Sequence, residues 1–364
     1  MKRRRWESNL HWDIIYEILL RLPVKSLVRF KCVCKSWLSL ISDPHFAKSH
    51  YNLSASPSHK LLLIERSGSE TRSLDVDAFL HTDASVILRP PKPGKRPSLE
   101  ILGSCRGFLF IERYPNLYLL NPSVGFLRDL SYFEIGQEHH NEVKPLIGFG
   151  YDPSTDNYLI VVLFSTFNND DMADRLVIFS LRTNSLKEIQ MPHIPFYYSE
   201  NQSLLFNDAI HWLAYGENRL KVILAFDLIK ENFYEISLPD GDFTIGFSFC
   251  NLGTMGGCLC LCQFDRSKTI VWIMKKYKLQ SSWIMIEIAR NLSAACMAKG
   301  GELVALSFDD GELMKFNDKG QFLERCEYYF DDLSGFEVAA YTESLLSLPM
   351  KQPQKNQIRR NRNA

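Results

Sequence analysis

Cysteines are the residues best placed to do chemistry in this 364-residue sequence. Cys105 lies in GSCRG (103–107), which fits the G-x-C-x-G form of a nucleophile elbow. Such an elbow must follow a strand and open a helix, whereas the segment that follows here, FLFIERYPNLYLLNP, has the pattern strand, turn, strand. The pattern favours a tight turn that enters a β-hairpin. A hydrolase with Cys105 as nucleophile remains the alternative function.

The other cysteine groups have weaker claims to a metal or redox site. Cys32 and Cys34 form a C-x-C pair in LPVKSLVRFKCVCKSW (22–37). On a regular helix this spacing separates the two thiols by about 200°, so they cannot hold one ion, and we expect buried structural thiols. Cys258, Cys260 and Cys262 share one face of a predicted strand, where free cysteines behave as small hydrophobic residues.

Histidines and glycine-rich motifs add no further site. His211 lies in the apolar segment NDAIHWLAYG (207–216), which predicts a core histidine. His139 and His140 are adjacent in a polar loop and would point apart in an extended chain. The phosphate-loop, dinucleotide-binding and H-E-x-x-H patterns do not occur. We therefore expect no metal and no cofactor.

Composition limits the classes of partner. Lys+Arg and Asp+Glu both number 42, so the whole-chain charge argues against nucleic acid or an anionic membrane as partner. The apolar run YLIVVLF (158–164) is strand-sized, far shorter than a membrane span. No apolar segment follows the basic N-terminus, so a signal peptide is not expected. Nine cysteines without such a signal predict reduced thiols in the cytoplasm, the nucleus or both.

Residues 10–50 predict three short helices. Apolar residues recur at helical spacing in each one: Ile14, Ile15, Ile18, Leu19 and Leu22 in the first, Val24, Leu27, Val28 and Phe30 in the second, and Trp37, Leu38 and Ile41 in the third. Pro23 separates the first two helices, and Ser42-Asp43-Pro44 ends the third. A Ser/Pro-containing linker follows at residues 51–60. The first helix has an apolar arc of about 140°, wider than one core-facing stripe, which indicates a protein partner.

Residues 61–348 predict an all-β domain, so the fold class is α+β with a helical prefix and a propeller-like domain. An apolar run, a turn and a second apolar run recur at 117–130, 176–189 and 223–239, with weaker copies at 271–288, 313–326 and 61–74. Short strands without crossover helices favour a β-propeller, whose blade number stays open. Residues 1–9 are a basic N-terminal segment, and 349–364 are a polar tail that we expect to be disordered.

The segment LHWDIIYEILLRLPVKSLVRFKCVCKSWLSLISDPHFAKSH (10–50) resembles a plant F-box over nearly its whole length. The remainder is similar to the kelch-type, propeller-like F-box-associated domain of the same plant family. The segments GSCRGFLFI, LLNPSVG, GFGYDPSTDNYLIV and FSLRTNSLKEI carry this likeness. One departure is Leu10-His11, where the family has Leu-Pro.

The resemblance implies a non-catalytic substrate receptor of an SCF (Skp–cullin–F-box) ubiquitin ligase. The F-box would bind a Skp-type adaptor and, through it, a cullin–RING ligase, and the β domain would recruit a target protein for ubiquitination. The family pattern implies these adaptor-binding residues: Leu10, Ile14, Ile18, Leu19, Leu22, Pro23, Leu27, Val33, Cys34 and Trp37. Cys32 and Cys34 are then packing residues of the docking domain.

Target capture is expected on loops of the β domain, because a propeller fills its interior with side chains. The segment MPHIPFYYSENQ (191–202) places Phe196, Tyr197 and Tyr198 between prolines and polar residues. Aromatic side chains on a proline-stiffened loop bury much area at small entropic cost. They could equally cover the edge of a blade.

Overall fold

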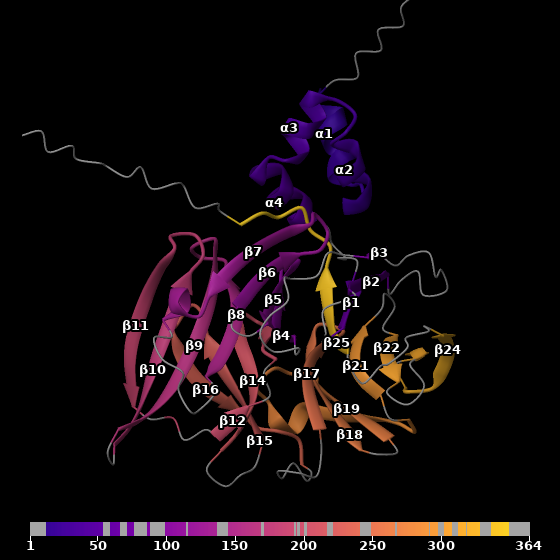
Figure 1. Ribbon diagram of the computed structural model, residues 1–364. Helices are drawn as coiled ribbons and strands as arrows, with labels where there is room; N and C mark the ends of the chain where they lie inside the picture. The colour runs from indigo at the N-terminus through magenta and orange to yellow at the C-terminus, as the bar shows by residue number, and fades with distance from the viewer. Residues whose placement is uncertain are drawn as a thin grey trace, which may run out of the picture.

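The fold is taken from a computed structural model of the chain. It describes residues 12–53, 59–65, 71–75, 86–87, 99–113, 116–136, 145–168, 171–192, 194, 197–199, 202–216, 221–240, 249–265, 268–290, 292–297, 302–307, 312–317, 319–327 and 336–348. A small helical unit lies against one face of a ring of β-sheets (Figure 1). The N-terminal segment 1–9 and the tail 349–364 lie outside the described residues.

The helical unit contains four helices where the sequence predicted three: α1 (Trp12–Leu20), α2 (Val24–Phe30), α3 (Lys35–Ile41) and α4 (Pro44–Leu53). Asp43 begins the additional helix, since its carboxylate accepts hydrogen bonds from the backbone N–H groups of His45 and Phe46, at 2.8 and 3.1 Å. Pro44 takes the first helical position, where a missing N–H costs nothing. The Asp43-Pro44 pair therefore starts a helix as well as ending one.

Helix α4 also shortens the predicted linker. Residues 51–53 finish this helix, and β1 begins at His59, so only 54–58 lie between the two elements, outside the described residues. Phe46, Ala47 and His50 are the buried side of α4. The structure therefore assigns residues 51–53 and 59–60, which the sequence places in the linker, to α4 and β1.

The β domain is a propeller of six antiparallel sheets. Blade 1 contains β4 (Glu100–Cys105), β5 (Phe108–Arg113), β6 (Asn116–Asn121) and β7 (Phe126–Ser131), and blade 2 contains β8 (Leu146–Asp152), β9 (Asn157–Asn168), β10 (Asp171–Ser180) and β11 (Ser185–Pro192). Blade 3 contains β12 (Tyr197–Ser199), β13 (Leu204–Phe206), β14 (Ala209–Tyr215), β15 (Lys221–Asp227) and β16 (Asn232–Ile236). Blade 4 contains β17 (Phe249–Met255), β18 (Cys258–Asp265), β19 (Lys268–Met274) and β20 (Trp283–Ile288), and blade 5 contains β21 (Leu292–Met297), β22 (Leu303–Ser307), β23 (Glu312–Phe316) and β24 (Phe322–Glu327).

Blade 6 joins the two ends of the β domain. Its strands follow the order β25 (Phe336–Thr342), β1 (His59–Glu65), β2 (Thr71–Asp75) and β3 (Val86–Ile87). β25 pairs antiparallel with β1, with Leu62 opposite Ala339. A C-terminal strand that completes an N-terminal sheet closes the ring of blades.

All six predicted hairpins are present, one in each blade. Five of them are the outer pairs β6–β7, β10–β11, β15–β16, β19–β20 and β23–β24, and the sixth is β1–β2.

Close packing between blades 2 and 3 depends on glycine at Gly148, because a Cβ there would lie 2.5 Å from the Trp212 ring. Within the described residues, no helix has the length and apolarity that a membrane span requires.

Candidate functional site

The helical unit exposes several of the predicted adaptor-binding residues. Ile14, Ile18 and Val33 are 51%, 49% and 60% exposed. Pro23 and Cys34 are exposed, and Leu22 and Trp37 are partly buried. The sequence prediction missed Trp12 and Leu38, which are also large apolar residues, 53% and 47% exposed. Half-exposed apolar side chains on a small unit are typical of a protein interface.

The remaining predicted residues are internal or undescribed. Leu19 and Leu27 are 1% and 0% exposed, so in this structure they hold the helices together and offer no surface to a partner. Leu10 and the unusual His11 lie outside the described residues.

The prediction that Cys32 and Cys34 are buried is wrong, because both are exposed. They do not lie on one regular helix. The segment from Lys31 to Val33 is a turn after α2, and Cys34 is the N-cap of α3 with extended φ and ψ of −160° and 166°. Cys34 therefore belongs to the exposed surface beside Val33.

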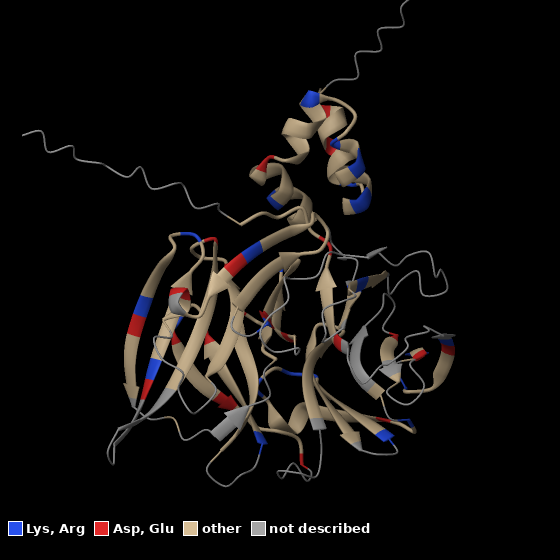
Figure 2. Ribbon diagram, viewed as in Figure 1, with Lys and Arg blue, Asp and Glu red and all other residues tan. Residues whose placement is uncertain are grey.

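Helix α2 adds basic residues to the exposed surface of the helical unit. Helix α2, with the sequence VKSLVRF, contains Lys25 and Arg29 and no acidic residue, and both side chains are exposed. Figure 2 shows blue bands on α2. A partner of this surface must therefore accept both apolar and cationic side chains.

The opposite side of the helical unit shares one hydrophobic core with the propeller. This core contains Leu19, Leu27, Ile41 and Phe46 of the helices, Phe108, Phe149 and Tyr158 of blades 1 and 2, and Leu345, Leu346 and Leu348 of the C-terminal segment. The sequence raised the possibility that the helices only pad the β domain. One side does pack on it, and the other side remains exposed.

Arg106 lies at the centre of this contact between the helical unit and the propeller, here called the joint. Its guanidinium lies 4.6 Å from the ring centroid of Tyr51 at the end of α4 and 3.9 Å from that of Tyr151 in β8. A guanidinium between two aromatic faces is held by cation–π attraction from both sides. Arg106 also has a positive φ of 48° in the β4–β5 turn, and its carbonyl accepts a hydrogen bond from the Ser344 hydroxyl at 3.1 Å.

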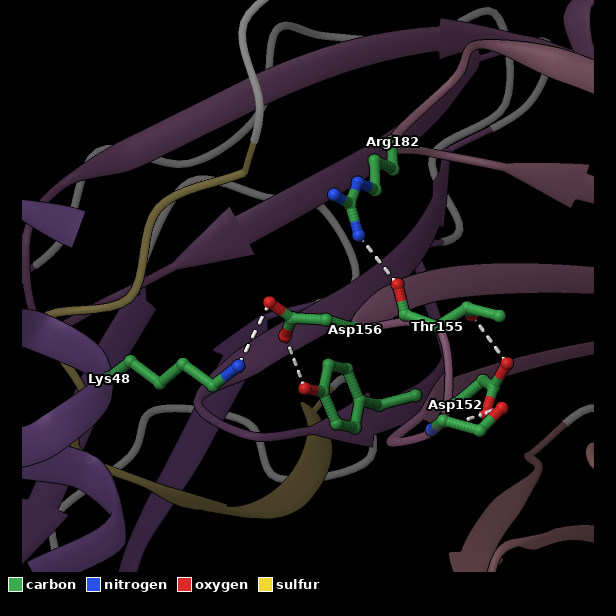
Figure 3. A network of polar contacts seen from close by, with 7 residues as sticks. Lys48, Asp152, Thr155, Asp156 and Arg182 are labelled. Atoms are coloured by element: carbon green, nitrogen blue, oxygen red, sulfur yellow. Dashed lines mark hydrogen bonds and ion pairs between the residues drawn. The ribbon is translucent and has the colours of Figure 1, made fainter. Parts of the chain in front are cut away.

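An ion pair extends the joint to the β8–β9 turn (Figure 3). The Lys48 ammonium of α4 lies 2.9 Å from the Asp156 carboxylate, which also accepts a hydrogen bond from the Tyr151 hydroxyl. These two hydrogen bonds, Tyr151 first, hold the pKa of Asp156 below its usual value of 3.8. The turn itself is braced by Arg182, which donates to the Thr155 carbonyl at 2.6 Å.

The C-terminal segment 343–348 lies between the helices and the propeller. The fully buried Asn121 amide donates to the carbonyls of Ser344 and Leu346, at 3.2 and 3.0 Å. In Figure 1 this segment continues from β25 and passes beneath α4. The helices therefore rest on a surface built from two blades and the end of the closing strand.

Cys105 has no catalytic environment. It ends β4, pairs with Phe108 across the Arg106–Gly107 turn, and no helix follows. The thiol is buried, and burial raises its pKa to about 12 despite the nearby Arg106 cation. A thiol in that state is not a nucleophile near neutral pH. The structure thus gives the hydrolase alternative no support, and it confirms the predicted hairpin turn.

The other candidate residues that the structure describes lie in strands of the β domain. Cys260 and Cys262 are buried in β18 beside the partly exposed Cys258, as expected for a strand interior. His211 is fully buried, which confirms a core histidine. His139 and His140 lie outside the described residues. Among the residues that the structure does describe, no group of three or more His, Cys, Asp and Glu could hold a metal ion.

Strand β12, the described strand of the aromatic segment 191–202, lies at the far end of the strands from the joint (Figure 1). Phe196 is outside the described residues, and Tyr197 and Tyr198 belong to β12, which pairs with β14. Arg182, in the β10–β11 turn, contacts the β8–β9 turn, which forms the ion pair with the helical unit. From the β10–β11 turn, β11 runs away from the helical unit (Figure 1). Strand β12, the next strand along the chain, therefore lies away from the helices (Figure 1).

Comparison with known proteins agrees with both parts of the chain. The F-box domain family matches residues 8–49, and the family described as F-box associated beta propeller domain matches residues 65–308. The F-box protein CPR1 of Arabidopsis thaliana is 29% identical over 306 residues, which cover 77% of this chain and 72% of that protein. The F-box/kelch-repeat protein At3g23880 of the same plant is 28% identical over 343 residues, covering 86% and 89%. The chain belongs to the plant F-box proteins with an F-box associated β-propeller domain.

Proposed function

We propose that this protein is a non-catalytic substrate receptor of an SCF-type ubiquitin ligase. Its F-box binds a Skp-type adaptor and thereby a cullin–RING ligase, and its propeller recruits a target protein for ubiquitination. The observation that carries the proposal is the exposed apolar surface of Ile14, Ile18 and Val33 on an F-box whose other side is buried. Burying such a surface against a partner is favourable, by about 25 cal/mol per Å² of apolar area.

The joint supports a receptor role, because it holds the adaptor-binding surface and the propeller in one orientation. Ubiquitin transfer requires a target to be presented at a fixed place relative to the ligase. Arg106, Lys48 and the segment 343–348 all connect the F-box to blades 1 and 2 or to the closing strand. A flexible tether would leave that orientation open.

Target capture is proposed for the propeller end that faces away from the F-box. Tyr197 and Tyr198 in β12 lie toward this end, and Phe196 precedes them in the chain. Replacing both tyrosines by Ala should remove captured partners while leaving thermal stability and adaptor binding unchanged. A marked fall in melting temperature would instead give the two rings a structural role. The proposed location is the cytoplasm, the nucleus or both, as expected for nine cysteines in a chain without a predicted signal peptide.

Reconstitution of the ligase tests the proposed function. The purified full chain is combined with a Skp-type adaptor, a cullin–RING module, ubiquitin, and activating and conjugating enzymes. We expect ubiquitin chains on the receptor itself, and their loss in the variant Ile14→Asp/Ile18→Asp. Leu186→Asp, at an exposed leucine of blade 2, is the matched control and should keep the activity. Absence of adaptor binding and ubiquitination in the unmodified chain would refute the proposal.

A further inference from the structure

The connection between β19 and β20 in blade 4 concentrates positive charge. It contains Lys275, Lys276 and Lys278, and the chain has no Asp or Glu between Arg266 and Ile286. All three lysines are exposed, and none forms an ion pair with a carboxylate of the described residues. The net charge of the whole chain is zero, so this turn is a local excess of positive charge.

Hydrogen bonds fix the backbone of this turn. The Lys275 N–H donates to the Ser282 carbonyl at 3.1 Å, and the Lys276 N–H donates to the Ser282 hydroxyl oxygen at 3.0 Å. Lys278 has a φ of +65°, which is uncommon for a residue with a side chain, and its N–H donates to the Met274 sulfur at 3.1 Å. The lysines therefore extend from a rigid support.

Aromatic residues beneath the turn place the Lys278 ammonium. It lies 3.4 Å from the ring centroid of Tyr234 and 5.4 Å from that of Tyr277. The Tyr277 hydroxyl donates to Nε2 of the buried His211 at 2.7 Å, and Nδ1 of His211 donates to the Leu204 carbonyl at 3.3 Å. Tyr234 donates to Tyr277 at 2.7 Å, so one chain of hydrogen bonds anchors both rings to blade 3. Cation–π contacts orient the ammonium without neutralising its charge.

The neighbouring β15–β16 turn adds an exposed apolar side chain, and its charged residues are already paired, Lys230 with Asp227 and Glu231 with Lys187 of blade 2. Asp227 interacts electrostatically with Lys278, but its carboxylate already accepts hydrogen bonds from the N–H groups of Ile229 and Lys230 and lies 3.7 Å from the Lys230 ammonium. Ile229 is 53% exposed, and Leu279 on the lysine-bearing turn is 45% exposed. The surface thus combines free ammonium groups with aromatic and aliphatic contact area.

We propose that Lys275, Lys276, Lys278, Ile229 and Leu279, here called the lysine turn, bind an acidic segment of the target protein. The proposal rests on the proposed receptor role and specifies the class of target. It is a contact separate from β12, because the Lys187–Glu231 ion pair places the β15–β16 turn at the strand ends nearer the F-box. Charge complementarity selects the occupant, because several unpaired cations on a rigid turn favour a chain of carboxylate or phosphate groups. The exposed Ile229 and Leu279 select an acidic peptide that also carries apolar side chains.

Fluorescence anisotropy with defined probes tests this proposal on the full chain in complex with its adaptor. The probes are fluorescein-labelled decaglutamate, a phosphoserine peptide of equal length and decathymidylate, at about 50 mM salt, where screening is weak. We expect decaglutamate or the phosphoserine peptide to bind, and the stronger of the two identifies the anionic group. The variant Lys275→Gln/Lys276→Gln/Lys278→Gln should weaken peptide binding by about tenfold or more.

A matched variant separates the lysine turn from general electrostatics. Lys319→Gln/Arg325→Gln removes two exposed cations of blade 5 and should weaken binding by less than about twofold. Equal losses in both variants, or no peptide binding by the unmodified chain, would overturn the proposal. Tighter binding of decathymidylate than of either peptide would overturn the peptide class in favour of nucleic acid. Adaptor binding is measured separately, so failure of the proposed function is distinguishable from failure of this site.

Discussion

Lys48 in the F-box and Asp156 in the propeller lie 108 positions apart in the chain, and their side chains form an ion pair of 2.9 Å. The two side chains are 43% and 51% exposed, so the pair contributes only about 0.5 kcal/mol to stability. The main effect of the ion pair is on the orientation of the two domains. It aligns α4 over the β8–β9 turn, next to the apolar core that the two domains share.

A double-mutant cycle measures this contact across the joint. Lys48→Ala and Asp156→Ala should each lower the free energy of unfolding slightly, and the double variant should lose less than the sum. The expected coupling is about 0.5 kcal/mol, measured by urea denaturation. Strictly additive losses would show that the ion pair does not form in solution.

The pH dependence of stability should report Asp156. Hydrogen bonds from Tyr151 and Lys48 lower its pKa below 3.8 in the folded state. The unfolded chain therefore binds a proton first as the pH falls, and the stabilisation present above pH 3.8 is lost below it. Asp156→Asn should be less stable than the unmodified chain at pH 7, and the difference should shrink at pH 3. A difference that stays constant would contradict the assignment.

His211 should produce a second pH dependence at higher pH. Burial, the largest cause, lowers its pKa from 6.5 to about 4. Between these values the unfolded chain is protonated at this residue and the folded chain is not, so stability should fall as the pH drops from 6.5 to 4. The loss is about 3 kcal/mol. His211→Gln should flatten this slope in urea denaturation, whereas His45→Gln, at an exposed position, should preserve it.

Gly107 tests the packing of the C-terminal segment. It has a φ of +87°, and a Cβ there would lie 2.7 Å from the Ser344 Cβ and 2.9 Å from the Thr342 carbonyl oxygen. Gly107→Ala should therefore cost about 2–4 kcal/mol of stability. Gly125 is the matched control, since its φ is +66° and nothing lies within 4 Å. Gly125→Ala should cost about 1 kcal/mol. Equal losses would mean that the segment 343–348 does not pack against this turn.

The hairpins could be predicted from the sequence because the information is local. Alternating apolar residues and a tight turn specify each pair of neighbouring strands, and Asn184 and Glu231 adopt the positive φ that such turns require. The blade number could not be predicted in the same way. Closure depends on β25 pairing with β1, at opposite ends of the β domain, which no local pattern specifies.

The errors in the helical region have physical causes. Helix α4, PHFAKSHYNL, contains few strongly apolar residues, and only the shared core reveals its buried side of Phe46, Ala47 and His50. The sequence pattern places Cys32 and Cys34 on one regular helix, but the chain forms a turn at residues 31–33. The joint contact of Arg106 with Tyr51 follows no sequence pattern, because it depends on how two domains pack.

The exposed F-box surface is the central claim, and its affinity for a purified Skp-type adaptor tests it most directly. Calorimetric titration compares the unmodified chain with Ile14→Asp/Ile18→Asp and with the control Leu186→Asp, after melting curves verify that all three are folded. The account predicts that the double variant binds at least about a hundredfold more weakly, because a charge is desolvated at an apolar interface, and that the control binds normally. Equal affinity of all three proteins would contradict it.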